Sequence, residues 1–211
     1  MAFGGWPAEA IEFFEGLEAD NSKSYWQAHK HVYEQAVRGP MDELVAELAP
    51  EFGEGKVFRP YRDVRFSADK SPYKTRIYAG FRHGGYVQFS ADGLAAASGY
   101  YQMAPDQLER YRHAVDDEGS GEELVRVVDG IKAAGVDVIG HWSLKTVPRG
   151  FARDHVRADL LRHKGLTTWK HWPTAAWMGT KAAKTRIVDA LRASRPLHDW
   201  LDHHVGPSEQ Q

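Results

Sequence analysis

The chain has 211 residues and a formal net charge of −2, and 42% of its residues are hydrophobic. This length suits one globular domain with a sizeable core. There is no cysteine, which excludes disulfides, thiolate nucleophiles and thiolate metal sites. The near-neutral charge disfavours a general nucleic-acid binder. With no targeting segment and no apolar run of about 20 residues, we expect a cytoplasmic protein with no membrane partner.

Residues 7–50 have the apolar periodicity of helices. Pro7 suits the start of a first helix, and Ser22 or Ser24 can cap a second helix that runs to Val37. Gly39-Pro40 is expected to separate this helix from a third one, which ends near Pro50.

Between residues 57 and 102 the apolar period changes to two, which is typical of half-buried strands. The turns between these strands are too short for crossover helices, so neighbouring strands are expected to be antiparallel. We predict a four-stranded meander with strands at residues 57–67, 77–83, 85–91 and 94–102.

Residues 105–205 are mostly helical in pattern. The predicted elements are helices at 105–115, 122–134, 155–164 and 181–204, a short strand at 136–144 and a tryptophan-rich connection at 167–180. No linker or repeat divides the chain. We therefore predict a single α+β domain over residues 1–211, in which the antiparallel meander packs against N-terminal and C-terminal helices.

Basic residues are concentrated between positions 59 and 76. This stretch has six cations against two acids, Asp63 and Asp69, so its net charge is 6 − 2 = +4. Such a concentration indicates contact with an anion, either a ligand or the protein's own acids. The six cations are Arg59, Arg62, Arg65, Lys70, Lys74 and Arg76.

Strand alternation gives these side chains different expected roles. Arg62 shares a face with Val64 and Phe66, so we predict that it is largely buried and paired with an acid or with carbonyl groups. Asp63 lies between two arginines, which favours an ionised, orienting carboxylate. Tyr73, in the loop that follows, is a candidate for hydrogen-bonding a ligand or for proton transfer.

Several motifs in this chain resemble the signature of a bacterial and fungal family, the domain of unknown function 2461 family. The resemblance implies a shared fold and a shared site with no activity attached, and it adds Arg112, Lys145 and Arg149 to the candidate ligand-binding residues. The motifs are Asn21-x-Lys23-x-x-Trp26, Arg59-x-x-Arg62-Asp63-x-Arg65-Phe66, Asp69-Lys70-x-x-Tyr73, Arg112, and Leu144-Lys145-x-x-Pro148-Arg149-Gly150-Phe151.

Three functional hypotheses remain open at this point. The first is binding, with or without turnover, of a small phosphate- or carboxylate-bearing ligand at the basic cluster. The second is binding of RNA or DNA ends, with arginines on phosphates and Trp169, Trp172 and Trp177 on bases. The third is an interaction domain in which the cluster is an internal ion-pair lattice. The eleven histidines lack metal-ligand spacing, so neither a metal nor another cofactor is expected.

Overall fold

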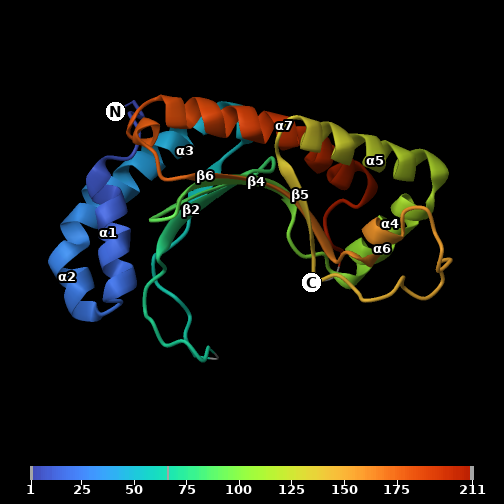
Figure 1. The fold of residues 1–211 in the computed structure, drawn as a ribbon, viewed down its shortest axis with the longest axis horizontal. Helices are drawn as coiled ribbons and strands as arrows, with labels where there is room; N and C mark the ends of the chain where they lie inside the picture. Colours follow the sequence, from blue (N-terminus) through green and yellow to red (C-terminus); the bar gives the residue numbers. More distant parts are fainter. Residues whose placement is uncertain (1, 66, 210–211) are drawn as a thin grey trace. The chain divides into compact units, whose positions relative to one another are not determined.

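The computed structural model describes residues 2–65 and 67–209 and has an α+β fold (Figure 1). Phe66, placed in the first predicted strand, lies outside the described residues. None of the described helices is long and apolar enough to cross a membrane. The helices are α1 (Ala8–Ala19), α2 (Lys23–Val32), a π-helix (Tyr33–Arg38), α3 (Gly39–Phe52), α4 (Pro105–Asp116), α5 (Glu118–Ala133), α6 (Ala158–Arg162), a 3-10 helix (Ala176–Gly179) and α7 (Ala182–His204).

The described strands form one sheet in the order β1-β2-β3-β4-β6-β5. The β1–β2, β2–β3 and β5–β6 pairs are antiparallel. The predicted α+β class is confirmed, but the sheet has six strands rather than four. The strands are β1 (Gly55–Val57), β2 (Arg76–Phe81), β3 (Tyr86–Ser90), β4 (Gly93–Tyr100), β5 (Asp137–His141) and β6 (Gly165–Pro173).

The chain divides into two compact units. Unit 1 comprises Met1–Ala96 and His171–Asp189, and unit 2 comprises Ala97–Lys170 and Ala190–Gln211. Strands β4 and β6 and helix α7 each continue from one unit into the other. Each unit has its own apolar core and is described separately below.

The helices at the start of unit 1 differ from the prediction at one point. The Ser22 side chain accepts a hydrogen bond from the backbone N–H of Tyr25, as expected for a helix cap. However, Gly39-Pro40 does not interrupt the helix. The chain instead widens into a π-helical turn, in which the Gly39 N–H reaches the Glu34 carbonyl. A wider turn leaves room for the ring of Pro40, which would clash with a carbonyl in a regular α-helix.

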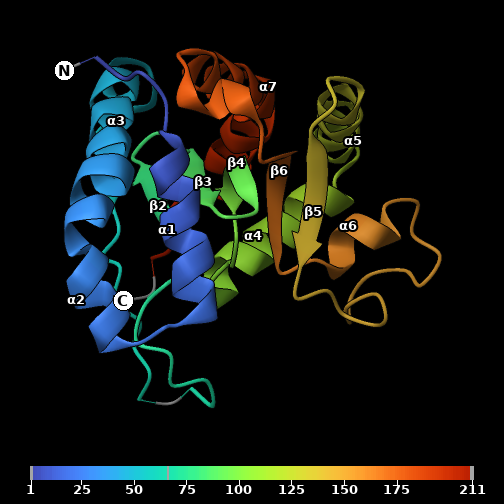
Figure 2. The same cartoon turned by 60° about the vertical axis from the view of Figure 1, so that its left-hand side comes forward.

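Aromatic side chains build the core of unit 1. The Trp6 ring stacks on Phe89 of β3 with centroids 4.6 Å apart, and Phe3 meets Trp6 edge to face at 5.1 Å. Both phenylalanines and Trp6 are almost fully buried. Helix α3 packs on β1 and β2, so this part of the sheet is covered by N-terminal helices (Figure 2).

The predicted strand at residues 57–67 is mostly wrong. Only Val57 belongs to β1, and the chain then leaves the sheet as a long two-limbed loop that returns at β2 (Figure 1). One bridge joins the limbs, with the Arg62 N–H bonded to the Pro72 carbonyl and the Lys74 N–H bonded to the Pro60 carbonyl. The reciprocal bonds would need N–H groups on Pro60 and Pro72. Because proline has no N–H, a regular ladder cannot form.

The sequence prediction missed strand β6, of which residues 165–170 lie in unit 2. The first half of the predicted tryptophan-rich connection, residues 167–173, belongs to β6, whose Thr167 and Thr168 are buried. The backbone N–H of Ser98 on β4 donates to the Thr168 hydroxyl at 2.9 Å. Helices α4, α5 and α6, with the second half of α7, enclose an apolar core of Met103, Tyr111, Val115, Leu124, Val128, Ile131, Val136, Leu161, Leu166, Leu197, Trp200, Leu201 and Val205.

Candidate functional site

Asn21 anchors the base of the β1–β2 loop in unit 1. Its side-chain amide accepts a hydrogen bond from the Tyr73 backbone N–H and donates one to the Tyr73 carbonyl, each at 3.1 Å. The Tyr73 ring stacks on Trp26 of α2, with centroids 4.3 Å apart and planes 6° apart. The first and third sequence motifs therefore meet in space, and they fix one limb of the loop against the helices.

Two ion pairs order the acids of the loop. The Arg65 guanidinium bonds both carboxylate oxygens of Asp63 at 3.0 and 2.7 Å, and this contact lowers the pKa of Asp63. Arg62 pairs with Asp69. Hydrogen bonds from Ser71, followed by the Arg62 contact, hold the pKa of Asp69 well below its usual range. Both carboxylates are therefore ionised at neutral pH.

The other four cations of the cluster make no ion pair with a carboxylate in the part of the chain that the structure describes. Lys74 Nζ donates to the Arg59 carbonyl at 2.8 Å and lies 4.6 Å from the centre of the Tyr78 ring. Lys70 Nζ donates to the Val64 carbonyl at 3.0 Å. The remaining two cations are Arg59 and Arg76, and Arg76 contacts the neutral Gln88 Oε1 at 3.4 Å.

A hollow of about 420 Å³ lies at the base of the loop, within unit 1. Most of its lining is polar, and three of the lining side chains are cations of the basic cluster. Asp63, Arg65 and Lys70, toward the loop tip, do not line it, and neither does Arg59. The lining residues are Glu18, Asn21, Arg62, Asp69, Ser71, Tyr73, Lys74, Thr75 and Arg76.

The structure differs from the predicted site in two features. The Arg62 side chain is 30% exposed rather than largely buried, although it does pair with an acid. The burial prediction was wrong because it relied on the alternation of a strand that does not form. Tyr73 is only 6% exposed, and burial raises the pKa of its phenol. Its stacked ring shapes one wall of the hollow.

The remaining predicted residues lie in unit 2. Arg112 is on α4, where burial lowers the pKa of its guanidinium and leaves its Nε without a hydrogen-bond partner in the described chain. Lys145 and Arg149 are exposed on the loop between β5 and α6. None of the three lines the hollow in unit 1.

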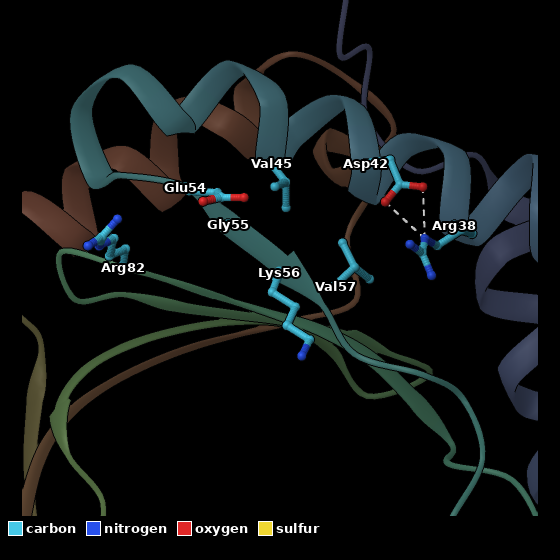
Figure 3. A pocket seen from close by; sticks show the side chains of 8 residues that line it. All are labelled: Arg38, Asp42, Val45, Glu54, Gly55, Lys56, Val57 and Arg82. Carbon is cyan, nitrogen blue, oxygen red and sulfur yellow. Dashed lines mark hydrogen bonds and ion pairs between the residues drawn. The ribbon is translucent and has the colours of Figure 1, made fainter.

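A second hollow, of about 540 Å³, also lies in unit 1 and was not predicted (Figure 3). It is bounded by α3, by strand β1 and by Arg82. Arg38 is turned toward Asp42 and bonds both carboxylate oxygens at 2.9 and 2.8 Å, whereas Lys56 points away from α3 (Figure 3). The cations around this hollow do not converge. The sequence gives little indication of this second hollow, because the lining residues come from three separate segments of the chain.

A metal centre has no support in the described residues, where no group of three or more His, Asp and Glu side chains is placed to hold an ion.

Comparison with known proteins identifies a family. A family model described as "Conserved hypothetical protein (DUF2461)" matches residues 9–200. The match spans both units and all the motifs quoted from the sequence. A search of curated proteins and a search of solved structures each gave no match.

Proposed function

Because the chain belongs to the DUF2461 family of conserved hypothetical proteins, whose description carries no activity, we propose a function from the site itself. The hollow at the base of the β1–β2 loop binds a small ligand that bears a phosphate or carboxylate group. Lys74 and Arg76 supply the positive charge, and Arg62, which is paired with Asp69, adds hydrogen-bond donors.

The observation that carries this proposal is the way in which Lys74 and Arg76 are held. Each is oriented by a neutral group, a backbone carbonyl for Lys74 and a side-chain amide for Arg76. A cation held by a neutral acceptor keeps its whole charge for a ligand, whereas a cation in an ion pair does not. Both residues line the same hollow.

Neutral polar groups complete the proposed site. Asn21, Ser71 and Thr75 lie in the lining and can hydrogen-bond a ligand after its charge is neutralised. Asp69 holds Arg62 at the edge of the hollow, and this positions the guanidinium for bidentate pairing with an oxyanion. If a reaction occurs here, its acceleration comes from cations that stabilise developing negative charge.

The rival hypothesis of a purely structural lattice explains only part of the cluster. It accounts for the Arg62–Asp69 and Arg65–Asp63 pairs. It does not account for Lys70, Lys74 and Arg76, which form no ion pair with a carboxylate in the described chain, whereas the charge of Arg59 acts on Asp63. Three cations and two acids, Glu18 and Asp69, line the hollow. The excess of positive charge disfavours the empty protein, and an anionic ligand relieves this cost.

A thermal-shift screen of phosphorylated and carboxylated metabolites tests the proposal. A ligand at 100 times its Kd adds about 2.7 kcal/mol to the free energy of unfolding, so a true ligand raises the melting temperature clearly. The same ligand should give no rise with Arg76→Gln, which removes the charge but keeps a polar side chain. A complete screen without a hit, or hits that Arg76→Gln leaves unchanged, contradicts the proposal.

A further inference from the structure

An exposed aromatic pair lies in unit 2, apart from the site proposed above. Tyr101 follows β4 and Trp142 follows β5, and each is 59% exposed. Their rings meet edge to face with centroids 6.1 Å apart, and Tyr101 also lies 4.5 Å from the His141 ring. Large aromatic side chains are usually buried when they serve only packing. Here two of them are more than half exposed.

The backbone at Trp142 is strained. Its φ of 52° is the one positive value among the non-glycine residues in the described chain. The left-handed region is costly for a residue with a Cβ atom, and asparagine or glycine is the usual occupant. Strained positions of this kind concentrate at binding sites. The strained position coincides here with an exposed tryptophan ring beside Tyr101.

Hydrogen-bonding groups adjoin the two rings. Ser143 Oγ lies 2.7 Å from His163 Nδ1, and His141 Nε2 lies 2.8 Å from the Thr167 hydroxyl. Burial lowers the pKa of both histidines, so both are neutral at neutral pH. Neutral imidazole and hydroxyl groups can act as donors or acceptors toward the edge of a heterocycle.

Basic residues follow the aromatic pair along the same loop. Lys145, Arg149 and Arg153 are exposed, and none of them forms an ion pair with any residue that the structure describes. No acid lies between Trp142 and Arg153 in the sequence, and Asp154 follows directly after Arg153. Ring faces next to unpaired cations match the alternation of bases and phosphates in a single strand.

We propose that Tyr101, Trp142 and the basic loop that follows form a binding site for single-stranded nucleic acid. Bases stack on the two exposed rings, and Lys145, Arg149 and Arg153 contact phosphates. Duplexes bind weakly, because their bases are already stacked on one another and cannot reach the rings. This site uses neither the arginines of residues 59–76 nor the three tryptophans considered from the sequence.

Fluorescence anisotropy with labelled oligo(U) and oligo(dT) of roughly 15 nucleotides tests this inference. Both strands should bind in a saturable manner. Trp142→Ala and Tyr101→Ala should each weaken binding at least about tenfold, while Trp142→Phe retains most of it. Lys145→Ala with Arg149→Ala should reduce the slope of log K against log salt by about 0.7 for each cation removed.

Two further variants separate the role of the ring from effects on folding. Trp142→Gly removes the ring and also relieves the strain at φ 52°, so it should raise the melting temperature while binding is lost. Phe58→Ala removes an exposed aromatic ring from unit 1 and should leave binding unchanged. The proposal is overturned if neither oligonucleotide binds, if duplex binds as tightly as single strand, or if Trp142→Gly binds like the wild-type protein.

Discussion

At the scale of single residues, Asn21 holds the base of the β1–β2 loop in place. Its two hydrogen bonds satisfy both backbone polar groups of Tyr73, a residue 52 positions away. Tyr73 is buried, so water cannot replace these bonds without opening the contact with Trp26. The side chain therefore holds one wall of the candidate site in place.

Replacement of Asn21 by alanine should lower the free energy of unfolding by about 1–3 kcal/mol, because two buried backbone groups lose their partner. Urea melts of Asn21→Ala and wild type give this difference directly. Gln27→Ala serves as the control, since it removes an exposed amide from α2. Equal stability of Asn21→Ala and Gln27→Ala would mean that Asn21 does not anchor the loop.

Arg65 lies toward the tip of the same loop, away from the base that Asn21 anchors. Its side chain is 76% exposed, and its ion pair with Asp63 is open to solvent and salt. We expect Arg65→Ala to leave the urea midpoint unchanged within experimental error, and Lys70→Ala to behave in the same way. A marked loss of stability in both variants would support the structural lattice as the role of the loop tip.

At the scale of elements, prolines and glycines explain where the sheet departs from the sequence pattern. Pro60 and Pro72 stand opposite residues to which they cannot donate, and this limits the loop to one bridge. Gly99 has a φ of 106°, and a Cβ atom there would lie 2.5 Å from the Leu166 carbonyl oxygen. The close approach of β4 and β6 in unit 2 therefore requires glycine at this position.

Two glycine-to-alanine substitutions in unit 2 should have opposite effects. Gly99→Ala should destabilise the protein by more than about 1 kcal/mol, because alanine is strained at this φ and meets the backbone of β6. Gly130→Ala should stabilise it by up to about 1 kcal/mol, since Gly130 lies within α5 and a Cβ atom there meets nothing within 4 Å. Thermal or urea melts measure the change in stability of each variant. A change in the same direction for Gly99→Ala and Gly130→Ala would contradict this account of the strand contact.

At the scale of the whole molecule, local signals predicted more than long-range ones. The α+β class and the positions of β2, β3 and β4 followed from period-two segments with short turns. Strand β6 was missed because its tryptophans suggested a connection, and its pairing with β4 and β5 joins residues far apart in the sequence. The cluster's location followed from charge density. The role of Asn21 could not be predicted, because it depends on a contact across 52 residues.

Buried tyrosines should make stability depend on alkaline pH. Burial raises the pKa of Tyr33 and of Tyr86 to about 12. Their folded-state pKa values exceed the ordinary value near 10. Their contribution to stability is therefore complete below about pH 10 and is lost as pH rises toward about 12. Urea melts across this range should show the decline, and Tyr33→Phe should flatten it. An unchanged slope in Tyr33→Phe would contradict the burial of this phenol as the cause.

The central claim is that the hollow beside Lys74 and Arg76 binds an anion. The most direct measurement is a calorimetric titration of the best ligand from the metabolite screen into Lys74→Met and Lys56→Met. Lys74→Met removes a cation from this hollow, and Lys56→Met removes one from the second hollow. The account predicts that Lys74→Met loses measurable binding while Lys56→Met binds like wild type. Retained affinity in Lys74→Met, or loss in Lys56→Met alone, would place the anion elsewhere and contradict the claim.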